Sequence, residues 1–327
     1  MQELIAGKTK IIVAPDEDIA GEKAAELAAK KLLAASGRGQ RTVLWMMAAP
    51  SGFSFYRALL NKAAADKSLK DVLNRTSIFQ FDDYPINRES ARFPVTFRHL
   101  LEEYLIYPLK SEAGIMPEWN PLELQGEETA DREVMHDYEQ RLLDQLRDEQ
   151  AYVLEIKGIG MDGHWGFHGS ETPLDTAPGL MRVPMNPENI YQQMIDWPQY
   201  FQTSSDVPKY AVTCSIAMFM LADTVIDIVP QYTKQFSVLA AYGTETVTND
   251  IPSSALVRHP DSISFITQQA AKALLAFRSG RAMSANYTID DDIWEELKRI
   301  WKENQNSSDA EQSIIKMRRI LSDLRII

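Results

Sequence analysis

The chain has 327 residues, 45% hydrophobic and 24% charged, which suits a globular protein with one large core rather than a disordered or fibrous one. Acidic residues outnumber basic ones by 46 to 34, and no basic stripe is present, so nucleic acid is not expected as a partner. The amino-terminal segment has no signal-peptide pattern, no apolar run of about 18 residues could span a membrane, and Cys214 is the only cysteine. We therefore expect a cytoplasmic protein with no disulfide and no membrane partner.

Short apolar segments rich in β-branched residues alternate with stretches of helical period along most of the chain. Ala20, Ala24 and Ala28 mark a helix after the first strand, and a second helix is predicted near 131–148. This alternation predicts an α/β fold with three layers, in which helices cover both faces of a mostly parallel, Rossmann-like sheet. The predicted strands are 10–14, 42–48, 77–81, 152–158, 210–214, 225–229 and 262–267.

The last 45 or so residues differ in character from the rest. We assign residues 1–282 to the α/β domain and residues 283–327 to a helical extension. The extension is expected to pack on the domain or on a partner subunit, so a homo-oligomer is possible. Its two apolar stripes are Ile293, Trp294, Leu297, Ile300 and Trp301, and Ile314, Met317, Leu321 and Leu324.

Ligands of open parallel sheets bind beyond the carboxyl ends of the strands, which directs attention to three segments. The first, WMMAAPSGFSFYRALL, passes from a strand through small residues into a helix. Ser51 is expected to cap that helix, and free N–H groups there could hold an anion such as a phosphate.

The second segment, SIFQFDDYPINRES, ends a strand with two carboxylates, Asp82 and Asp83. If the strand continues, they point to opposite faces, so only one of them can reach a cleft. Either could simply serve a turn or a helix cap, and the functional alternative is a partly shielded carboxylate base.

The third segment, GIGMDGHWGFHGSETPL, places Asp162 near His164, an arrangement that orients an imidazole for proton transfer. His168 lies four residues later, but the intervening glycines disfavour the helix that a histidine metal site would need. Acid–base chemistry is favoured over a structural loop and over a metal site, and we expect neither metal nor cofactor.

Over roughly residues 10–277 the chain resembles the glucosamine-6-phosphate deaminase family, which is related to the 6-phosphogluconolactonases. The strongest matches, in chain order, are FDDYP, GIGMDGHWGFHG, VPKYAVTCSIAMFMLADTVIDIV and IPSSALVRHP. The resemblance implies that Asp82 moves a proton between C1 and C2 of an open-chain sugar phosphate. It also implies that His164, held by Asp162, assists ring opening, and that Lys234 contacts the phosphate. Substrate contacts are expected from Ala49, Ser51, Gly52, Asp83, His168, Glu171 and Lys234.

The chain differs from the family pattern at three places. The phosphate loop, usually T-G-[ST]-T-P, matches 48–52, where Ser51 is the one hydroxyl. The phosphate-binding arginine falls at or near Gln193, and the glutamate of the ring-opening triad matches Gly169, with Glu171 two residues on. The alternatives to a deaminase are a lactone hydrolase, another sugar-phosphate isomerase, and a sugar-phosphate-binding protein without catalysis.

Overall fold

The computed structural model describes residues 1–279 and 307–326. Its strands are β1 (Gln2–Ala6), β2 (Thr9–Ala14), β3 (Arg41–Met46), β4 (Ser77–Gln80), β5 (Asp82–Asp83), β6 (Glu118–Asn120), β7 (Ala151–Lys157), β8 (Leu180–Pro184), β9 (Tyr210–Cys214), β10 (Thr224–Val229) and β11 (Ser262–Thr267). Its α-helices are α1 (Glu17–Gly37), α2 (Phe53–Ala65), α3 (Lys67–Leu73), α4 (Phe97–Leu101), α5 (Tyr107–Ser111), α6 (Glu128–Arg147), α7 (Pro187–Asp196), α8 (Ile216–Phe219), α9 (Gln235–Tyr242), α10 (Lys272–Arg278) and α12 (Ser307–Asp323). Shorter turns are the 3-10 segments η1 (Pro50–Gly52), η2 (Phe93–Val95), η4 (Tyr232–Lys234) and η5 (Pro252–Arg258), and the π-helical η3 (Glu102–Ile106).

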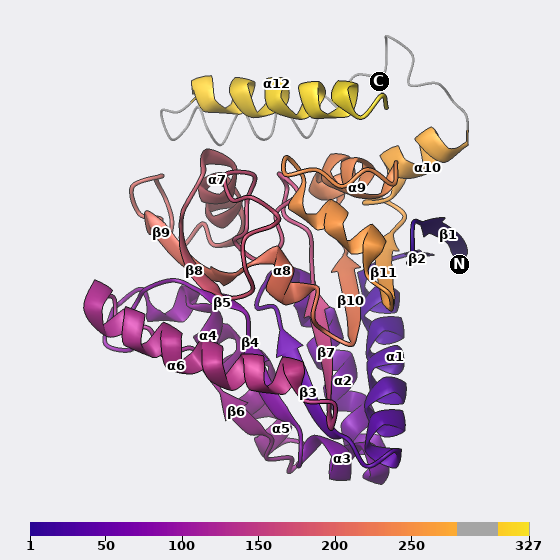
Figure 1. The fold of residues 1–327 in the computed structure, drawn as a ribbon, viewed down its shortest axis with the longest axis vertical. Helices are drawn as coiled ribbons and strands as arrows, with labels where there is room; N and C mark the ends of the chain where they lie inside the picture. The colour runs from indigo at the N-terminus through magenta and orange to yellow at the C-terminus, as the bar shows by residue number, and fades with distance from the viewer. Residues whose placement is uncertain (280–306, 327) are drawn as a thin grey trace.

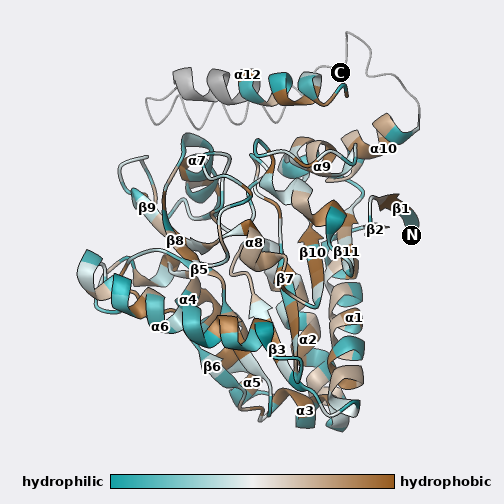
Figure 2. Ribbon diagram, viewed as in Figure 1, coloured by the Kyte–Doolittle hydropathy of each residue, from teal (hydrophilic) through white to brown (hydrophobic). Residues whose placement is uncertain are grey.

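The main sheet has the strand order β1-β2-β11-β10-β7-β3-β4-β6 and is parallel except for β1, which forms an antiparallel hairpin with β2. The side chains of β7 and β10 are buried along their whole length, as expected for strands covered on both faces. In Figure 2 most of the residues of these strands have the brown of hydrophobic residues. The predicted α/β class with a mostly parallel sheet is confirmed.

A second sheet, β5-β9-β8, is antiparallel and has three strands. We expected 210–214 to belong to the parallel sheet, and this was wrong. After β4 the chain continues through Asp82 into β5, where Asp82 pairs with Thr213 and so draws β9 out of the main sheet. The second sheet therefore positions one of the predicted site residues.

Helices lie on both sides of the main sheet, with α6 in front of the strands and α2 behind them (Figure 1). Helix α1 packs against α2 and against β11, β10, β3 and β7 through a face of small residues that includes Ala20, Ala24 and Ala28. On α1, Gly21 lets α2 approach so closely that a Cβ would lie 2.5 Å from the Ser54 hydroxyl. Small residues thus set the distance between these two helices.

The carboxyl-terminal helix α12 packs on α9 and buries Met317, Ile320 and Leu321. The predicted boundary at 282 and the apolar stripe at 293–301 lie outside the described residues. In the described part of the chain, no helix has both the length and the apolar character needed to cross a bilayer.

Candidate functional site

A cavity of about 500 Å³, including its open mouth, lies where the main sheet meets the second sheet. Segments that follow β3, β4, β7 and β10 contribute to its wall, as does helix α7. The wall is formed by Met47, Ala48, Ala49, Pro50, Ser51, Phe81, Asp82, Phe97, Gly158, Ile159, Gly160, His164, Gly166, Phe167, Gln192, Gln193, Asp196, Trp197 and Lys234.

Asp82 is in this wall and only 3% exposed. Its Oδ1 has no hydrogen-bond partner within the described part of the chain, so the oxygen is available to a ligand. Burial raises the pKa of the Asp82 carboxyl well above its usual range, and the charges of Asp83 and Glu155 add to the shift. A raised pKa brings a carboxylate closer to the range in which it can take and return a proton near neutral pH.

Asp83, which was predicted to contact substrate, lies outside the cavity wall. One oxygen accepts hydrogen bonds from the backbone N–H groups of Tyr84 and Phe97, and the other from Arg98 N–H and the Gln80 amide. Burial raises the pKa of Asp83 to about 6, although these donors oppose the shift. The alternation along the strand turns Asp82 to the cavity and leaves Asp83 to hold the start of α4.

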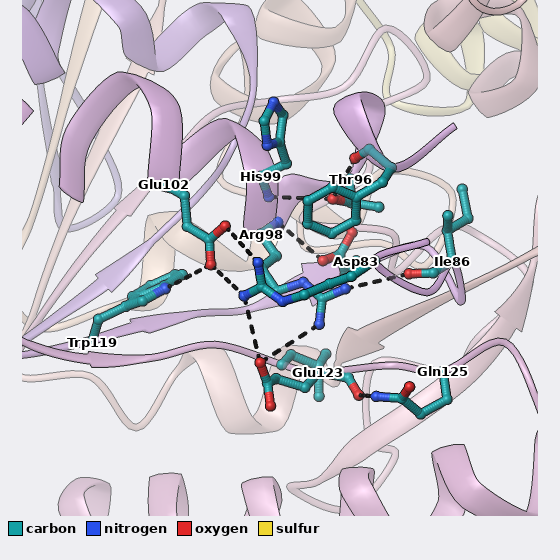
Figure 3. A network of polar contacts seen from close by, with 12 residues as sticks. Asp83, Ile86, Thr96, Arg98, His99, Glu102, Trp119, Glu123 and Gln125 are labelled. Carbon is teal, nitrogen blue, oxygen red and sulfur yellow. Dashed lines mark hydrogen bonds and ion pairs between the residues drawn. The ribbon is translucent and has the colours of Figure 1, made fainter. Parts of the chain in front are cut away.

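Figure 3 shows the polar network around Asp83. The Arg98 side chain is 1% exposed, lies over the Phe93 ring, and donates to the Ile86 carbonyl at 3.4 Å. Nearby, Arg88 forms a two-pronged pair with Glu102, at 2.6 and 3.1 Å. This network fixes α4, which presents Phe97 to the cavity.

His164 lines the cavity, and Asp162 lies behind it with Oδ1 2.6 Å from the His164 Nδ1. Burial alone would raise the pKa of the Asp162 carboxyl, but the nearby His164, Asn186 and Lys316 outweigh it and hold the pKa below its usual value. Asp162 is thus an ionised partner at Nδ1, which leaves Nε2 of His164 for proton exchange with a ligand.

Two glycines of the loop make room for this arrangement. A Cβ on Gly160 would lie within 2.3 Å of three atoms of the His164 ring. Gly166 has a left-handed φ of +62°, and a Cβ there would lie 2.6 Å from Thr213 Oγ1 and 3.3 Å from Asp82 Oδ2. The glycines therefore allow the imidazole and the Asp82 carboxylate to pack against backbone.

His168, which was predicted to contact substrate, does not line the cavity. It is fully buried; Nδ1 accepts from the Ile216 N–H at 3.2 Å, so Nε2 donates to the Thr172 carbonyl at 3.1 Å. In the parts of the chain that are described, no group of three His, Cys, Asp or Glu side chains is placed to hold a metal ion.

We expect the stability of the fold to depend on His168 between pH 6.5 and 4. Burial lowers the pKa of His168 to about 4, opposed by the Thr172 carbonyl, so in this window the unfolded chain binds more protons. The free energy of unfolding should fall as the pH is lowered. Urea denaturation at several pH values measures this, and His168→Gln should flatten the dependence. An equal slope in both proteins would contradict the role of His168.

Glu171 also lies outside the cavity wall, and its side chain is exposed. It is nevertheless linked to the His164 pair, because Asn186 donates to Asp162 at 3.1 Å and lies 3.4 Å from both Glu171 oxygens. A Cβ on Gly169 would lie 2.7 Å from Glu171 Oε2, so Glu171 reaches back to the place of the family's glutamate. Its connection to the imidazole runs through Asn186.

The loop before α2 does not cap the helix through Ser51, as the sequence predicted. Ser51 was expected to cap the helix, but α2 has Gly52 at its N-cap and no side-chain cap. Instead the Ser51 hydroxyl donates to Gln231 Oε1 at 2.8 Å and accepts from Lys234 Nζ at 3.3 Å. Ala49, Ser51 and Lys234 line the cavity, whereas Gly52 lies behind the wall with the Tyr56 ring against it.

Several wall residues carried no signal in the sequence. Gln192 and Asp196 come from α7, and Phe97 comes from α4, so none of them follows a strand of the main sheet. The amphipathic pattern of a short helix does not show that its polar face borders a cavity. Gln193, by contrast, was located by its alignment with the family's arginine.

Below the site lies a buried ionic cluster, in which Lys157 and Asp227 are both 0% exposed and 3.2 Å apart. Lys157 Nζ also contacts Ser253 Oγ at 3.4 Å, and Ser253 donates to the His164 carbonyl at 2.9 Å. The cluster therefore supports the loop that carries His164. Nearby, Trp165 Nε1 donates to the buried Glu155 at 2.6 Å.

Comparison with known proteins finds similar curated proteins, although no family model matches the chain. A glucosamine-6-phosphate deaminase of Streptococcus sanguinis is 26% identical over 265 residues, which is 81% of this chain and 99% of the relative. The chain is therefore similar to the glucosamine-6-phosphate deaminases along most of its length and diverges from them in sequence.

Solved structures show the fold of this deaminase family. A monomeric glucosamine-6-phosphate deaminase, described as a missing link of the NagB superfamily, matches with a TM-score of 0.64 and 19% identity over 80% of this chain and 98% of that one. A 6-phosphogluconolactonase from Trypanosoma cruzi matches with a TM-score of 0.61 and 15% identity over 83% and 98%. The chain thus shares its fold with proteins of both names.

Proposed function

We propose that the protein is a deaminase/isomerase that opens the ring of an amino sugar or related sugar phosphate and moves a proton between C1 and C2. The observation that supports this most directly is the unpartnered Oδ1 of the buried Asp82 in the same cavity as His164. A carbon base must be close to the substrate and shielded from water, and a separate acid must reach the ring oxygen.

In this proposal His164, oriented by Asp162, takes the proton of the C1 hydroxyl and passes it to the ring oxygen as the C1–O5 bond breaks and the C1 aldehyde forms. Asp82 then removes the proton from C2 and returns it to C1, so the C1–C2 enolamine becomes an imine at C2. Water adds to the imine, and ammonia leaves as the ketone forms. The same carboxylate takes and gives the proton, so no cofactor is required.

Lactone hydrolysis is the second candidate, and the names of structural neighbours favour it. It would use His164 to activate water at the lactone carbonyl and would need no carbon base. Asp82 would then have no chemical role, which separates the two candidates.

The proposed reaction predicts both ammonia release and exchange at carbon. The purified protein is incubated in D₂O with hexosamines and their 6-phosphates, while NMR follows deuterium at C1 and an enzymatic assay follows ammonia. His164→Gln should lose both signals with cyclic substrates. If neither deuterium exchange nor ammonia release is detected with any of the hexosamines or their 6-phosphates, the proposal is contradicted. Release of acid from sugar lactones would favour the second candidate.

A further inference from the structure

One group of cavity residues bears on the substrate: Ser51, Gln193, Asp196 and Lys234, which we name the Lys234 corner. The family resemblance places the phosphate of the substrate here. Lys234 Nζ contacts Ser51 Oγ at 3.3 Å, and Asp196 is the charged neighbour with the largest effect on Lys234. The corner therefore combines one cation, one carboxylate and two neutral polar side chains in the wall of the same cavity.

The charge of this corner is poorly matched to a phosphate. Among the described residues that line the cavity, Lys234 is the sole lysine or arginine, and Asp196 offsets its charge. Gln193, at the place of the family's arginine, is neutral and buried. Sugar phosphates are mainly dianionic at neutral pH, and a buried dianion is stable only with charged or strongly donating partners.

Three backbone positions of the loop before α2 offer an anion no free N–H group. In the loop before α2, Pro50 has no N–H, the Gly52 N–H is bonded to the Ala49 carbonyl at 2.8 Å, and the Phe53 N–H is bonded to the Pro50 carbonyl. The Ser51 hydroxyl gives its proton to Gln231. In the loop at the N-terminus of α2, where an anion could bind, these donors already form hydrogen bonds within the protein.

A hydroxyl suits the same surface. It can donate to the Asp196 carboxylate while it accepts from Lys234 Nζ or from the Gln193 amide, so all partners remain satisfied. A phosphate offers acceptor oxygens and, as a dianion, has no proton to give to Asp196. The Lys234 corner thus favours a hydroxyl, which both donates and accepts hydrogen bonds, over a phosphate dianion, which only accepts them.

We propose that the Lys234 corner binds the hydroxyl end of an unphosphorylated sugar and that Asp196 is the residue that excludes the phosphorylated form. That the ligand is a sugar rests on the proposed function. The exclusion of phosphate rests on the charges and hydrogen bonds of the corner.

Isothermal titration calorimetry with two matched pairs tests this: glucosamine against glucosamine 6-phosphate, and glucitol against glucitol 6-phosphate. In the wild type the free sugar should bind at least about tenfold more tightly, a difference of about 1.4 kcal/mol. Asp196→Asn should strengthen binding of the phosphates by about tenfold or more, and adding Gln193→Arg should strengthen it further. Free sugars should change by less than about threefold.

The same change on the remote surface of α3, Asp71→Asn, is the matched control and should alter neither affinity. Tighter binding of a phosphate than of its free sugar by the wild type would overturn the inference, as would an Asp196→Asn variant with unchanged phosphate affinity. Absence of binding by both free sugars would also overturn it. If free sugars bind but no ammonia is released, the proposed function fails and this inference stands.

Discussion

Asp82→Asn is expected to lower the rate of ammonia release by about 100- to 10,000-fold, the usual contribution of a positioned base. The amide keeps the shape of the side chain but cannot accept the proton from C2. Steady-state assays of ammonia, with deuterium exchange at C1 as a second readout, measure the effect. Because the variant also removes a buried carboxyl from a site that raises its pKa, its thermal stability should not fall.

Lactone hydrolysis by the same variant is the control. It should be unchanged if it occurs, since that reaction takes no proton from carbon. In the wild type, deamination should decline as the pH falls through the raised pKa of Asp82, because the base must be ionised, so the decline should lie above the ordinary carboxyl range. Full deaminase activity in Asp82→Asn would exclude Asp82 as the base.

Lys157→Met is expected to lower the free energy of unfolding by about 3–5 kcal/mol. The substitution leaves Asp227 fully buried without its cation, although Tyr242 and Ser264 still donate to Asp227 at 2.6 Å. Burial lowers the pKa of Lys157 while Asp227 opposes the shift, so each charge of the pair depends on the other. Guanidinium denaturation provides the measurement.

The double variant Lys157→Met, Asp227→Asn separates an unpaired charge from lost packing. Because the amide carries no charge, most of the stability should return. If the double variant is as unstable as the single one, the loss comes from packing against Trp165, whose ring lies 4.5 Å from Lys157 Nζ.

The sequence predicts the six inner strands of the main sheet, because burial on both faces leaves mainly apolar runs, and it misses the edge strands β1 and β6. Strands β7 and β10 are of this kind. It does not predict β5 or β8, since β5 has two residues and β8 is partly exposed. The sequence also does not predict which sheet β9 joins, because an apolar run looks the same in either sheet. Its pairing with β5 places β9 in the second sheet.

The sequence likewise predicts only part of the candidate site. Asp82 and His164 follow strands of the main sheet, where the sequence directs attention, and strand alternation explains why Asp83 faces away. Asp196 could not be found in this way, because it lies on a helix that reaches the cavity through tertiary packing. Its charge becomes meaningful only beside Lys234, 38 positions away in the chain.

The pairing of β2 with β11 has a consequence for biosynthesis. Thr9 and Ser262, 253 residues apart, lie 2.8 Å from each other through their hydroxyl oxygens. A ribosome adding about 5–20 residues per second takes roughly 13–50 s to cover that separation. Throughout this interval one edge of β2 has no partner strand, which exposes the nascent chain to aggregation. The protein can close its main sheet only after β11 has been synthesised.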